Sequence, residues 1–137
     1  MSESPLAKNW REHGNAIGIV AGTKTGGISG RNWSHSELYD FARPIRGFTL
    51  TESYLMGRRA CYTCPIGCKR VVKIDSGPHR TEEGPGPHFQ TCCNLGTSLM
   101  NNNLEVVIKA GELCNRYGLD VISCGSVISF AMECFMK

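Results

Sequence analysis

Apolar residues recur at helical spacing in the second half of the chain. We predict a helix over Asn103–Tyr117, where Gly118 occupies the position of a left-handed cap. Its apolar face keeps the i, i+3, i+4, i+7 spacing through Leu104, Val107, Ile108, Gly111 and Cys114. A further helix over Gly125–Phe135 is apolar nearly all round, so we expect it to be buried. The chain reaches Lys137 without supplying neighbours for every face of that helix, which favours a fragment of a larger protein.

The first half of the chain is less periodic. Residues 14–32 are rich in glycine and predict a loop with at most one short strand. A short helix is predicted over Ser34–Ala42, because Pro44 disfavours helical backbone just beyond it. A second is predicted over Thr49–Arg58, where Thr49 and Glu52 have the spacing of a capping box.

Little of the chain predicts β-structure. Arg70–Ile74 has the composition of a short strand, and residues 75–88 hold enough proline and glycine to predict a loop. The expected fold is therefore mainly α, with little sheet. Residues 1–60 form a glycine-rich loop and short helices, and residues 61–137 carry a cysteine cluster followed by the long helices.

Charge and hydropathy exclude several function classes. The net charge of +3 is mild and the basic residues are scattered, so we expect no nucleic-acid partner. The first ten residues lack an apolar signal core, which favours a cytoplasmic and reducing compartment. The most apolar stretch, Val121–Met136, falls short of the roughly 20 residues that span a bilayer, so no membrane segment is expected.

Cysteine is abundant, with 8 residues in 137, and in a reducing compartment such residues are metal ligands or buried thiols rather than disulfides. The segment CYTCPIGC places Cys61, Cys64 and Cys68 within one short loop, where Pro65 and Gly67 permit tight turns. Such a loop can direct three sulfurs toward one point. We predict that these three residues ligate an iron–sulfur cluster.

Two other interpretations of the cysteines stay open. A structural zinc site normally has four ligands in two pairs, and no second pair follows here, but a zinc-stabilised interaction module without catalysis remains possible. A small iron–sulfur electron carrier is the other alternative, although such proteins usually carry CxxCxxC. A fourth ligand lies outside the chain or is one of Cys92, Cys93, Cys114, Cys124 and Cys134. Four basic residues flank the cysteine segment: Arg58, Arg59, Lys69 and Arg70. They offset the negative charge of a cluster, bind an acidic partner protein, or are simply solvated.

Read together, CYTCPIGCKR, GPHFQT, CNRYGLDVIS and FAMEC resemble the aldehyde ferredoxin oxidoreductase family of tungsten–pterin enzymes. The likeness runs from about Gly22 onward and includes the RNW at residues 31–33. It implies part of helical domains 2 and 3, and a 4Fe-4S cluster whose first three ligands match Cys61, Cys64 and Cys68. It also implies a tungsten or molybdenum bis-pterin, and ferredoxin or an iron–sulfur subunit as electron partner. The family's fourth cysteine and its N-terminal pterin domain have no counterpart here, so an internal piece is expected.

The family's pterin motif, an acidic residue followed by two variable positions and Gly-Leu-Asp or Gly-Leu-Cys, matches residues 115–120. The resemblance therefore assigns pterin contacts to Asn115, Leu119 and Asp120. Asn115 replaces the usual carboxylate but still forms hydrogen bonds. The alternative for Asp120 is that it only caps the helix that follows.

A larger departure lies at residues 86–91, where the family commonly has Gly-Pro-Glu-Tyr-Glu-Thr and this chain has GPHFQT. His88 and Gln90 replace the two carboxylates and are our candidate catalytic residues. Gln90 cannot take a proton, whereas His88 can act as an acid or a base. This change favours reduction of an aromatic acyl-CoA, as in the benzoyl-CoA reductase branch, slightly over aldehyde oxidation. Alternatively, His88 is a surface loop residue, and Glu82 or Glu83 stands in for the lost carboxylates.

Overall fold

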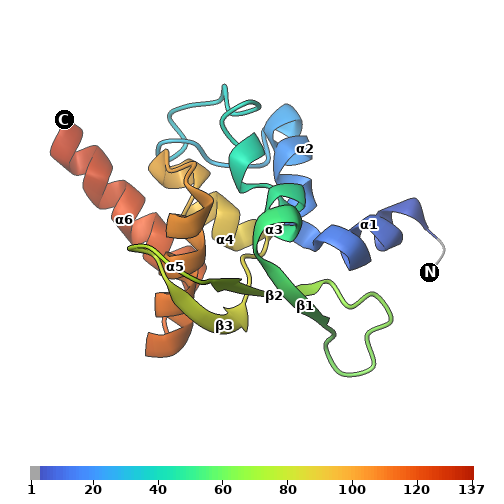
Figure 1. The fold of residues 1–137 in the computed structure, drawn as a ribbon. Helices are drawn as coiled ribbons and strands as arrows, with labels where there is room; N and C mark the ends of the chain where they lie inside the picture. The colour runs from blue at the N-terminus through green and yellow to red at the C-terminus, as the bar shows by residue number, and fades with distance from the viewer. Residues whose placement is uncertain (1–3) are drawn as a thin grey trace.

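The computed structural model describes residues 4–137 and is mainly helical, as the sequence predicts. The helices are α1 (Pro5–His13), α2 (Gly18–Thr25), α3 (Gly47–Tyr54), α4 (Phe89–Asn94), α5 (Leu104–Tyr117) and α6 (Val121–Met136). Short 3-10 turns are η1 (Asn15–Ile17), η2 (Arg43–Ile45) and η3 (Thr97–Leu99). An antiparallel sheet has the order β1 (Leu55–Arg59), β2 (Lys69–Ile74), β3 (Thr81–Pro85). Figure 1 shows the sheet below α2, α3 and α4, with α5 and α6 at one side.

The predicted loop over residues 14–32 is wrong in part, because it contains η1 and α2. The glycines here serve close packing rather than chain reversal. A Cβ on Gly18 would lie 3.4 Å from the Phe89 ring, and one on Gly22 would lie 3.0 Å from Ile28. Ile19, on the same helix, is fully buried. Glycine therefore lets α2 approach the start of α4, and α2 ends at Gly26 in the left-handed conformation, with φ 69°.

The two helices predicted before the cysteines are also corrected. Residues 34–42 form turns rather than a helix, and the buried side chains of Leu38 and Ala42 anchor them to the core. The next helix, α3, ends at Tyr54, where the chain enters β1 instead of continuing to residue 58. Thr49 does not cap it, since its hydroxyl donates to the carbonyl of Arg43 at 3.2 Å.

The strand predicted over residues 70–74 is confirmed as β2, but the loop predicted over residues 75–88 contains β3. Pairing with β2 overrides the local proline and glycine content: Val72 lies opposite Gly84, and the hydroxyl of Thr81 accepts the N–H of Ile74 at 3.1 Å. Pro85 is the last residue of β3. This position is one where a strand tolerates a missing N–H.

The helix predicted over Asn103–Tyr117 is confirmed as α5. The side chain of Asn103 accepts hydrogen bonds from the backbone N–H groups of two residues in its first turn, and Gly118 after its last residue is left-handed, with φ 67°. Helix α6 differs from its prediction because it begins at Val121 and is largely exposed rather than buried. Gly125 and Ser129 are its buried residues, whereas Phe130 is 62% exposed. The helix contacts α4 and η3 along a narrow stripe of small residues, which leaves its apolar remainder in solvent.

The core lies where α2, α3, α4 and α5 meet the inner face of β2. Its largest fully buried side chains are Ile19, Leu38, Ile45, Leu50, Val72, Val107, Thr97 and Cys92. Within residues 4–137, no single helix has both the length and the apolar character to cross a membrane, and α5 with α6 meets that criterion only as a pair bent by 118°.

Candidate functional site

The three candidate cluster ligands lie on one loop between β1 and β2 (Figure 1). Cys61 is exposed, and Cys64 and Cys68 are half-buried. A turn joins the first two, since the N–H of Cys64 donates to the carbonyl of Cys61 at 3.0 Å. Left-handed backbone at Thr63, φ 57°, and Gly67, φ 63°, folds the rest of the loop. The sequence therefore concentrates three thiols on one exposed turn.

The loop favours the thiolate form that metal ligation requires. Backbone N–H groups of Gly67 and then Ile66 are directed at the sulfur of Cys64 and lower its pKa. Among residues 4–137, no group of three or more cysteine, histidine or acidic side chains lies close enough together to hold a metal ion. The donor type and the amide groups fit an iron–sulfur cluster, which takes cysteine thiolates as ligands.

The other five cysteines lie away from this loop. Cys92 and Cys93 are buried in α4, and burial raises the pKa of Cys93 to about 12. Burial and the neighbouring thiol of Cys124 on α6 raise the pKa of Cys114 on α5. Cys134 is exposed near the end of α6. None of these five belongs to the turn that carries the three candidate ligands.

His88 directly precedes α4, makes no side-chain capping bond to it, and is half-buried rather than fully solvated. Its Nδ1 lies 3.1 Å from Oδ1 of Asn15, which also accepts the backbone N–H of Phe89 at 3.1 Å. Because a carbonyl oxygen only accepts, Nδ1 is the donor, and in the neutral ring Nε2 keeps its free lone pair. Burial, followed by the charges of Lys69 and Arg70, lowers the pKa of His88. The imidazole is therefore held neutral, with Nε2 able to accept a proton.

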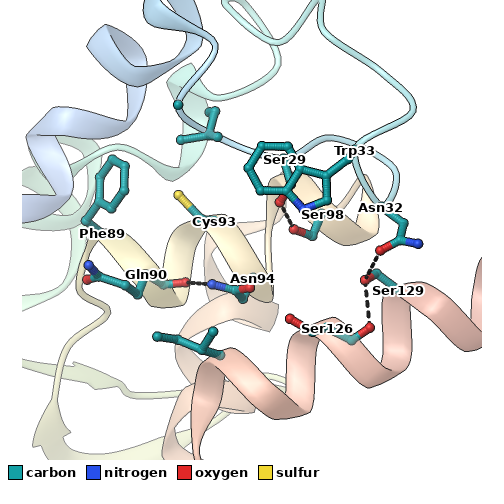
Figure 2. Close-up of a pocket in the computed structure, with 13 residues that line it drawn as sticks. Ser29, Asn32, Trp33, Phe89, Gln90, Cys93, Asn94, Ser98, Ser126 and Ser129 are labelled. Carbon is teal, nitrogen blue, oxygen red and sulfur yellow. Dashed lines mark hydrogen bonds between the residues drawn. The ribbon is translucent and has the colours of Figure 1, made fainter.

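Gln90 lines a separate cavity of about 290 Å³ between α4, η3, α6 and the loop before Trp33 (Figure 2). The described residues around it are all uncharged: Gly27, Ile28, Ser29, Asn32, Trp33, Phe89, Gln90, Cys93, Asn94, Ser98, Ile122, Ser126 and Ser129. His88 is not among them, so the structure does not bring the two catalytic candidates into one cavity. Hydroxyl, amide and aromatic groups make this space suited to a neutral ligand.

Hydrogen bonds between distant segments fix the cavity walls. The hydroxyls of Ser29 and Ser98 form a hydrogen bond with each other. The hydroxyl of Ser129 donates a hydrogen bond to Oδ1 of Asn32 at 3.2 Å. The amide of Asn32 in turn donates to Glu133 at 2.6 Å. The sequence did not single out these serines. The RNW segment was the available signal, because it contains Asn32 and Trp33.

The residues assigned to the pterin lie in the turn between α5 and α6. Asn115, Leu119 and Asp120 are all exposed. Asp120 caps α6, because its carboxylate accepts the N–H of Ser123 at 2.7 Å, a bond that lowers the pKa of Asp120. The capping role is thus present, and the pterin contact stays a prediction. Ile122, just after this turn, lines the cavity.

The acidic residues considered as substitutes for the lost carboxylates lie elsewhere. Glu82 and Glu83 are exposed on β3, and Glu82 pairs with Arg80 at 3.1 Å. Neither is among the described residues that line the cavity. The structure therefore gives them no place beside Gln90.

Comparison with known proteins identifies the family of this chain. Residues 1–137 match the family model described as Aldehyde ferredoxin oxidoreductase, domains 2 & 3. Tungsten-containing aldehyde ferredoxin oxidoreductase of Thermococcus kodakarensis is 32% identical over 126 residues, which is 92% of this chain and 20% of that protein. The protein of the same name in Pyrococcus furiosus is 35% identical over 100 residues, 73% of this chain and 16% of that protein.

A third relative, the aliphatic sulfonate oxidoreductase WOR-like subunit of Pyrococcus furiosus, is 27% identical over 78 residues, covering 57% of this chain and 12% of that protein. The chain thus spans about a fifth or less of the length of these curated relatives. The match over its whole length nevertheless settles the family. The chain belongs to the aldehyde ferredoxin oxidoreductase family, within domains 2 and 3.

Proposed function

We propose that this chain contributes the iron–sulfur side and part of the substrate pocket of a tungsten–pterin oxidoreductase. Cys61, Cys64 and Cys68 would hold a 4Fe-4S cluster, and the turn at residues 115–120 would contact a tungsten, or molybdenum, bis-pterin. When bound, the metal centre would exchange two electrons with the substrate and the cluster would relay them singly to ferredoxin or an iron–sulfur subunit. Relatives named as tungsten-containing ferredoxin oxidoreductases support this proposal, and we place the enzyme in the cytoplasm.

One observation carries the proposal: residues 14 and 15 contact both the cysteine loop and His88, since a Cβ on Gly14 would lie 3.1 Å from the carbonyl of Cys68 and Asn15 accepts a hydrogen bond from His88. Lys69 and Arg70 directly follow Cys68, and their charges are also felt at His88. The candidate cluster ligands and the candidate proton-transfer group are therefore linked through residues 14 and 15 and the first residues of β2. A zinc-stabilised interaction module would not require a proton-transfer group. A small electron carrier would not require a ligand cavity such as the uncharged one next to α4.

Aldehyde oxidation fits the geometry of His88 best. Conversion of an aldehyde and water to a carboxylic acid releases two electrons and two protons. His88, neutral and with Nε2 free, would take one of these protons. Gln90 lines a separate cavity, where its amide would bind a polar group of a neutral ligand without exchanging a proton. The uncharged cavity then matches a neutral substrate.

Reduction of an aromatic acyl-CoA is the second candidate, and the lining of the cavity favours it. Trp33 and Phe89 offer ring faces, and no carboxylate is among the described lining residues. Adding two electrons and two protons to a ring requires a proton donor, so His88 would have to enter the step protonated. Its lowered pKa opposes that state at neutral pH and weighs toward aldehyde oxidation.

Iron, zinc and acid-labile sulfide content after anaerobic reconstitution tests the proposal. We expect iron with matching sulfide in the unaltered protein, and loss of both in Cys64→Ser. Cys134→Ser is the matched control, because it removes an exposed thiol on α6 and should leave the iron content unchanged. Stoichiometric zinc without sulfide would instead indicate the interaction module. A complete cluster liganded wholly within these 137 residues would indicate the electron carrier.

A further inference from the structure

Arg70 carries a buried positive charge without an acidic partner among residues 4–137. The residue is 2% exposed. Its Nη1 donates to the carbonyl of Glu12 at 2.6 Å and its Nη2 to the carbonyl of Gly67 at 2.7 Å. Nε is buried and has no hydrogen-bond partner within the part of the chain that the structure describes. Both partners of the guanidinium are thus neutral carbonyls, and no carboxylate balances the charge.

The fold makes dedicated space for this side chain. A Cβ on Gly14 would lie 3.2 Å from Cγ of Arg70 and 3.1 Å from the carbonyl of Cys68. A Cβ on Gly86 would lie 3.1 Å from Cβ of Arg70. Gly14 also has φ 74°, a conformation that favours glycine. Two glycines from distant segments therefore enclose the stem of Arg70 and direct its head toward the cysteine loop.

The buried guanidinium of Arg70 needs an opposite charge close to it. Arg70 follows Cys68 by two positions, and its Nη2 donates to the carbonyl of Gly67 within the cysteine loop. A guanidinium remains charged in proteins. Burying a charge is strongly unfavourable unless an opposite charge is close. The loop that Arg70 contacts through Gly67 carries Cys64 and Cys68, two predicted cluster ligands, as its anion-forming groups.

We propose that Arg70 is a positioning residue for the iron–sulfur cluster, with its fixed charge stabilising the electron-rich cluster and its bond to Gly67 shaping the ligand loop. The inference rests on the proposed function, since it needs a cluster held by Cys61, Cys64 and Cys68. Reduction adds negative charge to the cluster, so a buried cation nearby favours the reduced state. Loss of that cation should make the cluster harder to reduce.

The test is a redox titration of the reconstituted protein, followed by electron paramagnetic resonance, in three variants. Arg70→Met removes the charge and keeps much of the stem, and we expect a midpoint potential more negative than that of the unaltered protein. Arg70→Lys keeps the charge and should bring the potential back toward that value. Arg59→Gln removes an exposed arginine from the neighbouring strand and should leave the potential unchanged, because solvent screens that charge.

Stability separates this role from a plain structural one. In the cluster-free protein the charge of Arg70 is unbalanced, so Arg70→Met should unfold at no lower urea concentration than the unaltered protein. An unchanged potential in Arg70→Met would overturn the inference, and so would a variant that fails to fold without the cluster. If the unaltered protein takes up no iron and sulfide, it is the proposed function that fails, a result separate from either of these.

Discussion

At the scale of single residues, the state of His88 depends on a side chain 73 positions earlier. Asn15 accepts one hydrogen bond from the ring and one from the backbone of Phe89, so its amide cannot rotate without losing the second bond. This arrangement fixes the proton on Nδ1. A neutral ring with a defined tautomer is what a proton acceptor needs, because Nε2 is then always the reactive atom.

The first prediction concerns the pH dependence of the complete enzyme. The lowered pKa of His88 means that the ring stays neutral below the ordinary value of about 6.5, so kcat/KM should fall only at more acidic pH. Asn15→Asp keeps the acceptor and adds a negative charge next to Nδ1–H, which favours the protonated ring. We therefore expect this variant to move the acid limb of the profile to higher pH.

Asn9→Asp is a suitable control, because Asn9 is exposed on α1 and the same charge is added there. Its profile should match that of the unaltered enzyme. An acid limb that stays in place in Asn15→Asp would show that the limb belongs to a group other than His88. The measured quantity is the pH at which the acid limb lies. A variant that merely loses activity at every pH would leave that pH unchanged.

At the scale of elements, the contact between α4 and α6 depends on one glycine. A Cβ on Gly125 would overlap the backbone carbonyl of Asn94, so larger residues cannot be accommodated without moving the helix. This contact also closes the cavity, since Asn94 and Ser126 both line it. The packing of α6 and the shape of the candidate substrate site are therefore linked.

The second prediction follows from that contact. Gly125→Val should lower the free energy of unfolding by about 1–3 kcal/mol, the usual cost of overpacking, as measured by urea denaturation. Gly57→Val is the matched control, because nothing lies within 4 Å of a Cβ at Gly57 and valine suits a strand. Equal stability of both variants would mean that α6 does not pack on α4 in this way.

Elements with a strong local signal could be predicted from the sequence. Helix α5 has both regular apolar spacing and caps at its two ends, and β2 contains the β-branched residues Val71, Val72 and Ile74. By contrast, the glycine content of residues 14–32 predicts a loop, whereas in α2 Gly18 and Gly22 permit contact with Phe89 and Ile28. Strand β3 was missed because its partner β2, rather than its own composition, makes it a strand.

The candidate site likewise has one part with a local sequence signal and another that depends on contacts between distant segments. The cysteine loop is contiguous in sequence, so its three thiols could be recognised from their spacing. The cavity draws its walls from four segments, and the bond between Ser129 and Asn32 joins residues 97 positions apart. No local pattern encodes such a meeting. Likewise, the control of His88 by Asn15 depends on the packing of η1 against α4.

At the scale of the whole molecule, α6 presents an apolar surface on the side opposite its small-residue contact with α4. Val127 is 67% exposed, Phe130 62% and Phe135 93%. The outer groove along this helix is lined wholly by apolar side chains, from Val127 to Met136. Exposed apolar surface of this kind marks an interaction site or a tendency to aggregate, and a net charge of +3 provides little repulsion against association.

The third prediction is that the 137-residue chain, produced by itself, associates through this helix. Replacing Val127, Phe130 and Phe135 together with glutamine should reduce the average mass measured by light scattering toward that of the monomer. These side chains face solvent, so the substitutions should cost little stability. Tyr62→Gln is the control, since Tyr62 is 96% exposed on the cysteine loop and its removal should leave association unchanged.

The opposite result would be informative at the same scale. A chain that is monomeric at high concentration and unfolds in one sharp transition would show that α6 needs no cover, and its exposed residues would then be ordinary surface. Association that persists in the triple variant would place the contact elsewhere. If the triple variant reduces association and Tyr62→Gln does not, the exposed face of α6 is the surface through which the chain associates. Such a surface agrees with a chain that spans about a fifth or less of the length of its relatives.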